Sequence, residues 1–199
     1  MKIVIEEYQA SWANEFLAHR AAIYSILTDL DPNIEHIGST SVVGLCAKPT
    51  IDVLVGLSAA DQLDATISPM IKHSYTYFKK YEPAMPYRRL FAKLKPVSNK
   101  VPPSIIGHDD EFIRGQDFNV LANIHIVVKD TPHWHRHLAF RDFLRAHPEI
   151  RDEYGRLKKA ISGREFKDTN DYNDAKAAFI QEIGRQALVW YNSQDLANP

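Results

Sequence analysis

The chain has 199 residues, of which 45% are hydrophobic and 25% are charged, and its formal net charge is −1. These proportions are ordinary for a soluble globular protein, and a chain of this size can bury about 70% of its unfolded surface. A net charge this small supplies no global field that would recruit nucleic acid or an anionic membrane, so neither is indicated as a partner.

The cytoplasm is the expected location. Cys46 is the one cysteine, so no intramolecular disulfide can form, which fits a reducing compartment. The first seven residues turn acidic too soon for a signal peptide. No run of apolar residues approaches the roughly 18 that a membrane-spanning helix needs. The sequence favours no particular oligomeric state.

The first half of the chain predicts helices that alternate with strands. A helix is expected over residues 11–30, with Ser11 as a plausible N-cap, because apolar residues recur there at mostly helical spacing. Two β-leaning segments follow, at 34–37 and 50–55. The apolar spacing of residues 58–70 predicts a second helix.

Two further strands are expected over about 75–81 and 87–94. Residues 95–116 contain three prolines and two glycines and predict a long loop. A loop of this length inside a compact domain is often functional, and whether it closes over a pocket is left open.

The strongest strand of the second half is predicted at 118–128. Because side chains alternate along a strand, Asn123 and His125 are expected on one face, with Ile124 on the other.

Helices are expected for the remainder of the chain, over 131–146, 148–163 and about 169–190. The whole pattern predicts an α/β (α+β) fold, in which a mixed core of residues 1–130 is followed by C-terminal helices, residues 131–199, that pack on it.

A turn of small residues and a carboxylate mark the most informative stretch. The turn Gly38–Ser41 offers successive backbone N–H groups and three hydroxyls between two predicted strands. Asp52 lies in an otherwise apolar strand, where a carboxylate is costly to bury without a partner or a cation.

This stretch carries a resemblance. Gly38-Ser39, followed after twelve residues by Asp52 in an apolar strand, resembles the signature of the nucleotidyltransferase superfamily, a Gly-Ser turn and then a strand with Asp-x-Asp. The closer resemblance is to the GrpB-like family, and it extends over most of the chain. The segments that carry it are Glu35–Ser41, Lys48–Asp52, Tyr8–Trp12, Ile124–Val128 and Phe140–Pro148. The resemblance implies a nucleotidyltransferase-like mixed sheet flanked by helices, with a C-terminal helical extension.

The sequence departs from the superfamily pattern at one position. Superfamily enzymes usually hold metal with two acidic residues on the first motif strand and a third on a neighbouring strand. Here Leu54 occupies the second position, and the later strand offers His125. The resemblance therefore implies the fold and leaves catalytic competence open.

Asp52 and His125 are the candidate catalytic residues and the candidate metal ligands. If their strands lie side by side, a carboxylate and an imidazole can share one divalent cation, Mg²⁺ or Mn²⁺. The alternative is a structural Asp52 that accepts hydrogen bonds from the N–H groups of the Gly38–Ser41 turn.

Candidate ligand-binding residues surround this pair. They are Gly38, Ser39, Thr40, Ser41, Lys48, Arg88 and Arg89. The N–H groups of the turn can form an anion-binding concavity, and Lys48 can add a point charge for a phosphate. Arg88 and Arg89 alternate along a strand, so one of them is expected to face inward, where its forked guanidinium suits a phosphate. The alternatives are a plain polar turn, a surface lysine and a solvated edge strand.

Two histidines also have a spacing that can chelate zinc. His133 and His137 are four residues apart on a predicted helix. Because no acidic or thiol ligand lies nearby in the sequence, a solvated or substrate-facing basic stripe is the favoured interpretation.

Three functions follow from these observations. The first is an enzyme that transfers a nucleotidyl or related phosphoryl group with one divalent metal held by Asp52. The second is a module that binds a nucleotide or another phosphorylated small molecule without turnover, which Leu54 favours. The third is a protein-interaction domain whose surface is formed by the C-terminal helices.

Overall fold

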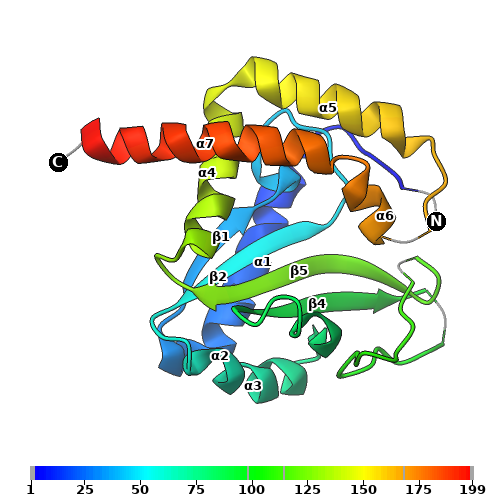
Figure 1. Cartoon of the computed structure of the whole chain (residues 1–199). Coiled ribbons are helices and arrows are strands. Elements are labelled where there is room, and N and C mark those ends of the chain that lie inside the picture. Colours follow the sequence, from blue (N-terminus) through cyan, green and yellow to red (C-terminus); the bar gives the residue numbers. More distant parts are fainter. Residues whose placement is uncertain (1–2, 98, 114, 168, 198–199) are drawn as a thin grey trace.

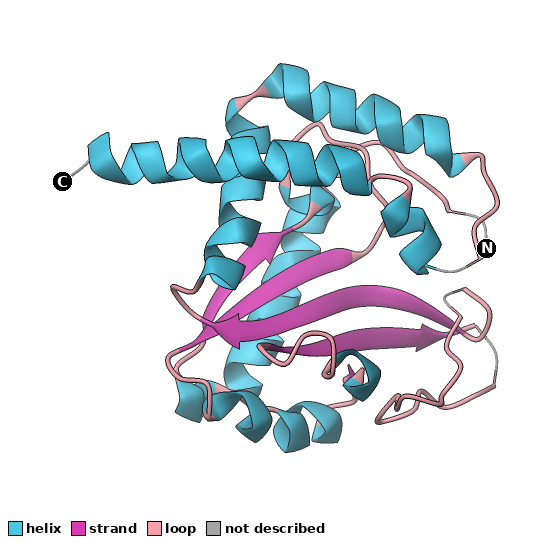
Figure 2. Cartoon of the chain, viewed as in Figure 1, coloured by secondary structure: helices cyan, strands magenta, loops and turns pink. Residues whose placement is uncertain are grey.

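The computed structural model describes residues 3–97, 99–113, 115–167 and 169–197. A five-stranded mixed sheet lies at the centre, with helices on both of its faces (Figure 1, Figure 2). The strands are β1 (Asn33–Ile37), β2 (Ile51–Leu57), β3 (Thr76–Tyr77), β4 (Arg88–Pro96) and β5 (Phe118–Val128). The α-helices are α1 (Ser11–Ile26), α2 (Gln62–Ala65), α3 (Ile67–Lys72), α4 (Pro132–Ala146), α5 (Pro148–Ser162), α6 (Thr169–Asp174) and α7 (Ala177–Ala197). Short 3-10 turns are η1 (Thr28–Leu30), η2 (Ser39–Ser41) and η3 (Lys79–Tyr81).

The strands run in the order β1-β2-β5-β4-β3, and β2 and β5 are parallel whereas the other neighbours are antiparallel. In the β2–β5 register, Asp52 lies opposite Asn123, and Leu54 lies opposite His125. The prediction that the strands bearing Asp52 and His125 belong to one sheet is confirmed. The predicted mixed sheet flanked by helices is confirmed as well.

One face of the sheet forms the main hydrophobic core. Val53 and Val55 of β2 point to this face, where they pack with Ile124 of β5 and with Trp12 and Ile23 of α1. All five side chains are buried. Because β2 and β5 lie in the interior of the sheet, β-branched residues can pack along both strands with little exposed surface.

The opposite face is only partly filled by helix α4. Trp134 and Leu138 pack on Leu54 and Val127 at one end of the strands. A Cβ atom at Gly56 would lie 2.7 Å from the Trp134 ring, so glycine permits this close approach of the helix to β2. The polar side chains at the other end of the same face are left uncovered by α4.

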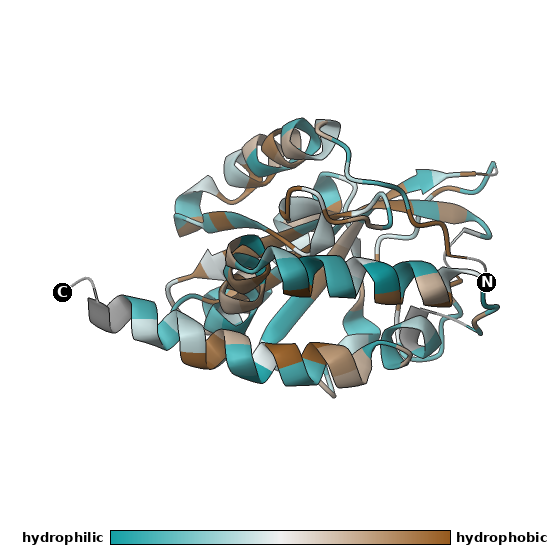
Figure 3. Ribbon diagram, turned by 90° about the horizontal axis from the view of Figure 1, so that it is seen from above, coloured by the Kyte–Doolittle hydropathy of each residue, from teal (hydrophilic) through white to brown (hydrophobic). Residues whose placement is uncertain are grey.

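Helices α5 and α7 form a further layer on α4. Ile183 and Ala187 of α7 pack with Ala139 and Phe143 of α4. Hydrophobic and hydrophilic residues alternate along α7, which can be followed from the C-terminus in Figure 3. This amphipathic pattern lets α7 bury one side and expose the other.

Several predicted elements are shorter than expected or divided. The first helix ends at Ile26 and continues as the turn η1, and the expected strand over 75–81 is a two-residue β3 followed by η3. The helix predicted over 58–70 is the pair α2 and α3, since Pro69 lacks an N–H group and is tolerated only in the first turn of a helix. The last predicted helix is α6 and α7, with residues 175 and 176 between them.

Helices α4 and α5 begin at the expected prolines, Pro132 and Pro148, and Thr131 caps the first of them by accepting a hydrogen bond from Trp134 N. Within the described ranges, every helix is too short or too polar to span a lipid bilayer.

Candidate functional site

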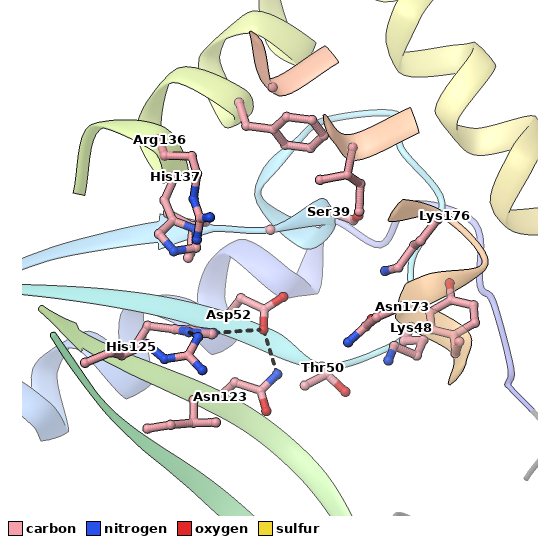
Figure 4. Close-up of a pocket in the computed structure, with 18 of the residues that line it drawn as sticks. Ser39, Lys48, Thr50, Asp52, Asn123, His125, Arg136, His137, Asn173 and Lys176 are labelled. Carbon is pink, nitrogen blue, oxygen red and sulfur yellow. Dashed lines mark hydrogen bonds and ion pairs between the residues drawn. The ribbon is translucent and has the colours of Figure 1, made fainter. Parts of the chain in front are cut away.

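A cavity of about 820 Å³ lies between the uncovered part of the sheet and the C-terminal helices. Strands β2, β4 and β5 form its floor, and residues of α4, α6 and α7 line it from above. Asp52 lies near the middle of the cluster of side chains that Figure 4 labels. A cavity of this volume is within the range of about 300–1,000 Å³ that is typical of small-molecule sites.

Positively charged side chains greatly outnumber negatively charged ones around the cavity. Among the described residues that line it, seven are lysine or arginine, and Asp52 is the single carboxylate. The seven are Lys48, Lys80, Arg88, Arg136, Lys158, Lys176 and Arg185. The formal charge of the whole chain is −1. The positive character is therefore local to this cavity.

Asp52 is held in its ionised form by its neighbours. Asn123 donates a hydrogen bond from Nδ2 to Asp52 Oδ1 over 2.6 Å, and His125 Nε2 lies 3.9 Å from the same oxygen. Burial would raise the pKa of Asp52, but His125, Asn123 and the charge of Lys48 overcome it and lower that pKa to about 2. The side chain is 29% exposed, so the carboxylate remains accessible from the cavity.

The turn before β2 packs directly on this carboxylate. Gly38 has φ +70° and ψ −175°, a conformation that is open almost only to glycine. A Cβ atom at this position would collide with Asp52 Oδ2 and would lie 2.9 Å from the Asp52 Cβ. Glycine is required at position 38 for both reasons.

Part of the hydrogen bonding of the turn is internal, and Arg145 of α4 and Lys158 of α5 also donate to it. Ser41 donates to Gly38 O from its backbone N over 3.2 Å and from its hydroxyl over 2.6 Å. In the described part of the chain, the side-chain hydrogen bond of Asp52 goes to Asn123 of β5 and not to the turn. This corrects the alternative in which Asp52 anchors the turn N–H groups.

His125, Arg136 and His137 lie on one side of Asp52 (Figure 4). With Arg88, which contacts His125, they form what we call the arginine end of the cavity. Arg88 donates from a guanidinium nitrogen to His125 Nδ1 over 3.2 Å. Because a guanidinium can only donate, Nδ1 accepts, and the proton of a neutral His125 ring is assigned to Nε2, facing Asp52. The ring of His137 lies 5.6 Å from that of His125. Burial, helped by the charges of His125, Arg136 and Arg88, lowers the pKa of His137 to about 3, so this ring is neutral at pH 7.

The other end is formed by Lys48, Lys158 and Lys176, and we call it the lysine end. The ammonium groups of Lys48 and Lys176 lie 4.8 and 4.5 Å from the centre of the Tyr172 ring. Lys158 is 2% exposed and donates to Ser39 Oγ over 3.0 Å and to Cys46 O. Burial lowers the pKa of Lys158 to about 7 and that of Lys176 to about 8.

The structure brings most of the predicted site residues to this cavity. Its lining includes Gly38, Ser39, Thr40, Lys48, Asp52, Arg88 and His125. Ser41 is buried beneath the turn and does not line the cavity. Arg89 lies opposite Ile126, on the other face of the sheet, and pairs with Asp64 over 2.7 Å, so it is separated from the predicted group.

The two helical histidines also separate. His137 lines the cavity, whereas the ring of His133 stacks on Tyr87 with 3.4 Å between ring centres. Among the described residues, no group of three or more histidine, cysteine, aspartate or glutamate side chains is arranged to hold a metal ion.

Several cavity residues were not predicted from the sequence. They are Asn123, Arg136, Lys158, Tyr172, Asn173 and Lys176. Lys158 had a usable signal, because it lies between Tyr154 and Ile161 on the buried side of α5, where a lysine is unusual. Asn123 shares the predicted face of β5 with His125, which is a weaker signal, and the sequence gives none for the others.

Comparisons with known proteins agree on one family. A family model described as GrpB protein matches residues 2–186. A UPF0157 protein of Halalkalibacterium halodurans is 34% identical over 187 residues, which are 93% of this chain and 82% of that protein. The glutamate-rich protein GrpB of Alkalihalophilus pseudofirmus is 24% identical over 182 residues, 92% of this chain and 94% of the other. The crystal structure of the conserved protein GrpB from Enterococcus faecalis matches with a TM-score of 0.74 and 31% identity, over 94% of this chain and 99% of that one.

The position of the missing second carboxylate is part of the packing. Leu54 has no exposed surface and packs with Trp134 and Leu138 of α4. It shares a face of β2 with Asp52, but α4 covers it and leaves Asp52 open. An acidic side chain at position 54 would be buried against α4 and would not reach the cavity.

We therefore expect Leu54→Asp to lower the free energy of unfolding by about 4 kcal/mol or more, because it buries an unpaired carboxylate. Urea denaturation monitored by circular dichroism measures this change. The control is Leu54→Met, which nearly conserves volume and should cost less than about 1.5 kcal/mol. Equal stability of the two variants would contradict the buried position of this side chain.

Proposed function

This chain belongs to the GrpB protein family, and from its cavity we propose that it binds a nucleotide or a related phosphorylated small molecule. The observation that carries the proposal is that, in the part of the chain that the structure describes, seven lysines and arginines and one carboxylate line the cavity. Cations held this close together repel one another, and an anionic ligand relieves the repulsion. Arginine can bind phosphate oxygens with two parallel hydrogen bonds, and lysine adds a compact point charge.

The cavity also has room for the uncharged part of such a ligand. Aromatic and apolar side chains line it together with the cations, and they include Phe78, Tyr81, Leu90, Phe112 and Phe140. Mostly apolar walls with a few polar groups that fix orientation are typical of small-molecule sites. A base or another flat ring would bury apolar surface here while its phosphates contact the lysines and arginines.

A panel of nucleosides, nucleotides and inorganic phosphates tests the proposal in thermal-shift experiments. We expect the phosphorylated compounds to raise the melting temperature and the matching nucleosides to have little effect. A ligand at one hundred times its Kd adds about 2.7 kcal/mol to the stability of the folded state. Calorimetric titration of the best compounds gives the Kd. The proposal fails if no phosphorylated compound in the panel binds.

Asp52 favours a second candidate function, phosphoryl or nucleotidyl transfer assisted by one Mg²⁺ or Mn²⁺. Its carboxylate is ionised, accessible and held in place by Asn123. His125 fits less well as a metal ligand, because Arg88 donates to its Nδ1 and the proton is then assigned to Nε2. A single carboxylate is sufficient when phosphate oxygens and water supply the other ligands, as is common for Mg²⁺. The cation would then arrive with the ligand, and its chemistry would be to neutralise charge on the reacting phosphate.

Asp52→Asn separates the two candidates. We expect this variant to lose the Mg²⁺-dependent part of nucleotide binding, and to bind metal-free nucleotide somewhat more tightly because a negative charge is removed from the cavity. Titrations with chelator and with Mg²⁺ measure both effects, and the loss of the charge-assisted hydrogen bond from Asn123 should cost about 1–3 kcal/mol of stability.

The matched control for this experiment is Glu35→Gln. Glu35 pairs with Arg141 over 2.7 Å and does not line the cavity. If Asp52→Asn and Glu35→Gln leave the same Mg²⁺ dependence, the metal role of Asp52 is rejected and binding alone remains.

The lysine end predicts a pH dependence of phosphate binding. The pKa of Lys158 is lowered to about 7 and that of Lys176 to about 8, so the free protein loses positive charge between pH 7 and 9. We expect the affinity for a phosphate that is fully ionised in this range to fall as the pH rises. Calorimetric titrations at several pH values measure the slope. Lys158→Met should reduce the change of affinity with pH near pH 7. The control is Lys159→Met, because Lys159 is an exposed neighbour that pairs with Glu7, and this variant should leave the pH dependence unchanged. A pH-independent affinity in the parent protein would contradict the prediction.

A further inference from the structure

Five of the seven lysines and arginines that line the cavity form two groups, one at each end. Figure 4 shows His125, Arg136 and His137 on one side of Asp52, and Lys48 and Lys176 on the other. Strand β5 and helix α4 supply the first group, while the second comes from the loop before β2 and the connection between α6 and α7. The carboxylate of Asp52 therefore lies between two separate positive regions.

Among the described residues that line the cavity, the arginine end has no carboxylate apart from Asp52. Arg88 uses a guanidinium N–H on the neutral acceptor His125 Nδ1, and Arg136 is exposed at the cavity. Among the described residues, neither arginine forms a salt bridge. By contrast, arginines elsewhere in the chain pair with acidic neighbours, such as Arg89 with Asp64 and Arg141 with Glu35 and Asp142.

The lysine end is built in a similar way. Lys158 is buried with two neutral oxygen acceptors, Ser39 Oγ and Cys46 O. Lys176 lies over the face of the Tyr172 ring. A buried ammonium without a carboxylate is costly, so an anion at this position would be strongly favoured.

The space between the two ends of the cavity disfavours negative charge. The carboxylate of Asp52 is partly exposed and faces the cavity between the two groups of cations. A phosphate placed directly over it would be repelled when no divalent cation intervenes. The cavity therefore favours negative charge at its two ends and a neutral group at its centre.

We propose that the ligand of this cavity carries two anionic groups, one bound at each end, joined by an uncharged segment that passes over Asp52. This inference rests on the proposed function and narrows its ligand to a bisphosphorylated small molecule. A ligand with one phosphate occupies the lysine end alone. A ligand with two phosphates at the right separation occupies both ends and gains the contacts of Arg88 and Arg136.

A series of linear alkane α,ω-bisphosphonates measures the separation between the two anionic positions. The anionic groups stay the same across the series, while the neutral chain between them lengthens. Alkyl monophosphonates of equal chain length are the reference compounds. Calorimetric titrations are carried out on the full chain with chelator present. We expect the affinity of the bisphosphonates to pass through a maximum at one chain length, where it exceeds that of the matched monophosphonate about tenfold or more.

Arg136→Gln identifies the second end. Arg136 is exposed and forms no salt bridge among the described residues, so this variant is expected to fold, which a thermal melt verifies. We expect it to bring the best bisphosphonate close to the affinity of the matched monophosphonate and to weaken the monophosphonate itself by a much smaller factor. The control is Arg156→Gln on the exposed side of α5, which does not line the cavity and should leave both affinities unchanged.

Two results would overturn the inference. If bisphosphonates of every length bind no better than monophosphonates, while nucleotides or inorganic phosphates still bind, the ligand has one anionic position and the proposed function stands. If Arg136→Gln weakens both classes equally, Arg136 acts on the cavity as a whole and no second anionic position exists. If none of these phosphonates and none of the phosphates binds, both the inference and the proposed function are rejected.

Discussion

The parallel pairing of β2 with β5 is the constraint from which the site follows. This register places Asp52 beside Asn123 and Leu54 beside His125, although the two strands are separated by about sixty residues of chain. Side chains on one face of the paired strands then divide between two environments. Leu54 and Val127 are covered by α4, while Asp52, Asn123 and His125 remain open. The cavity exists because α4 covers one end of this face and not the other.

The turn before β2 depends on the same pairing. Once β5 fixes the carboxylate of Asp52, the backbone at residue 38 passes so close to it that no side chain fits there. This turn also places Ser39 within hydrogen-bonding distance of Lys158. The contact joins the sheet to α5, although the two residues are more than one hundred positions apart in the sequence. One hydrogen-bonded carboxylate thus relates the position of the turn to that of the C-terminal helices.

Local patterns predicted much of this arrangement. Alternation along β5 assigned Asn123 and His125 to one face, and the small residues at 38–41 marked the turn. Alternation also predicted that only one of Arg88 and Arg89 faces inward. It could not say which, because the face depends on the register with β5, where Arg88 lies opposite Val127 and Arg89 opposite Ile126. Register is a property of two strands, and a single segment does not contain it.

The cavity residues that come from the helical half of the chain could not be predicted from local patterns, for a related reason. Lys176 reaches the site because the helix is interrupted between α6 and α7. Arg136 reaches it because α4 crosses the sheet where Gly56 leaves room for the Trp134 ring. These are consequences of how helices dock, which periodicity within each helix does not determine. The family resemblance implied the fold and the motif residues, and the comparisons support the family without naming a ligand.

Lys48 comes from the loop before β2, Lys158 from α5 and Lys176 from the connection between α6 and α7. The electrostatic repulsion among the three therefore acts between structural layers. This repulsion opposes the contacts that Lys158 makes with Ser39 and Cys46, which hold α5 against the turn and the loop before β2. An anion bound at the lysine end, as proposed, would offset this repulsion and bridge the layers. If the proposed ligand binds there, occupancy of the cavity would be coupled to the local rigidity of the C-terminal helices, because the charges that attract it also act between these layers.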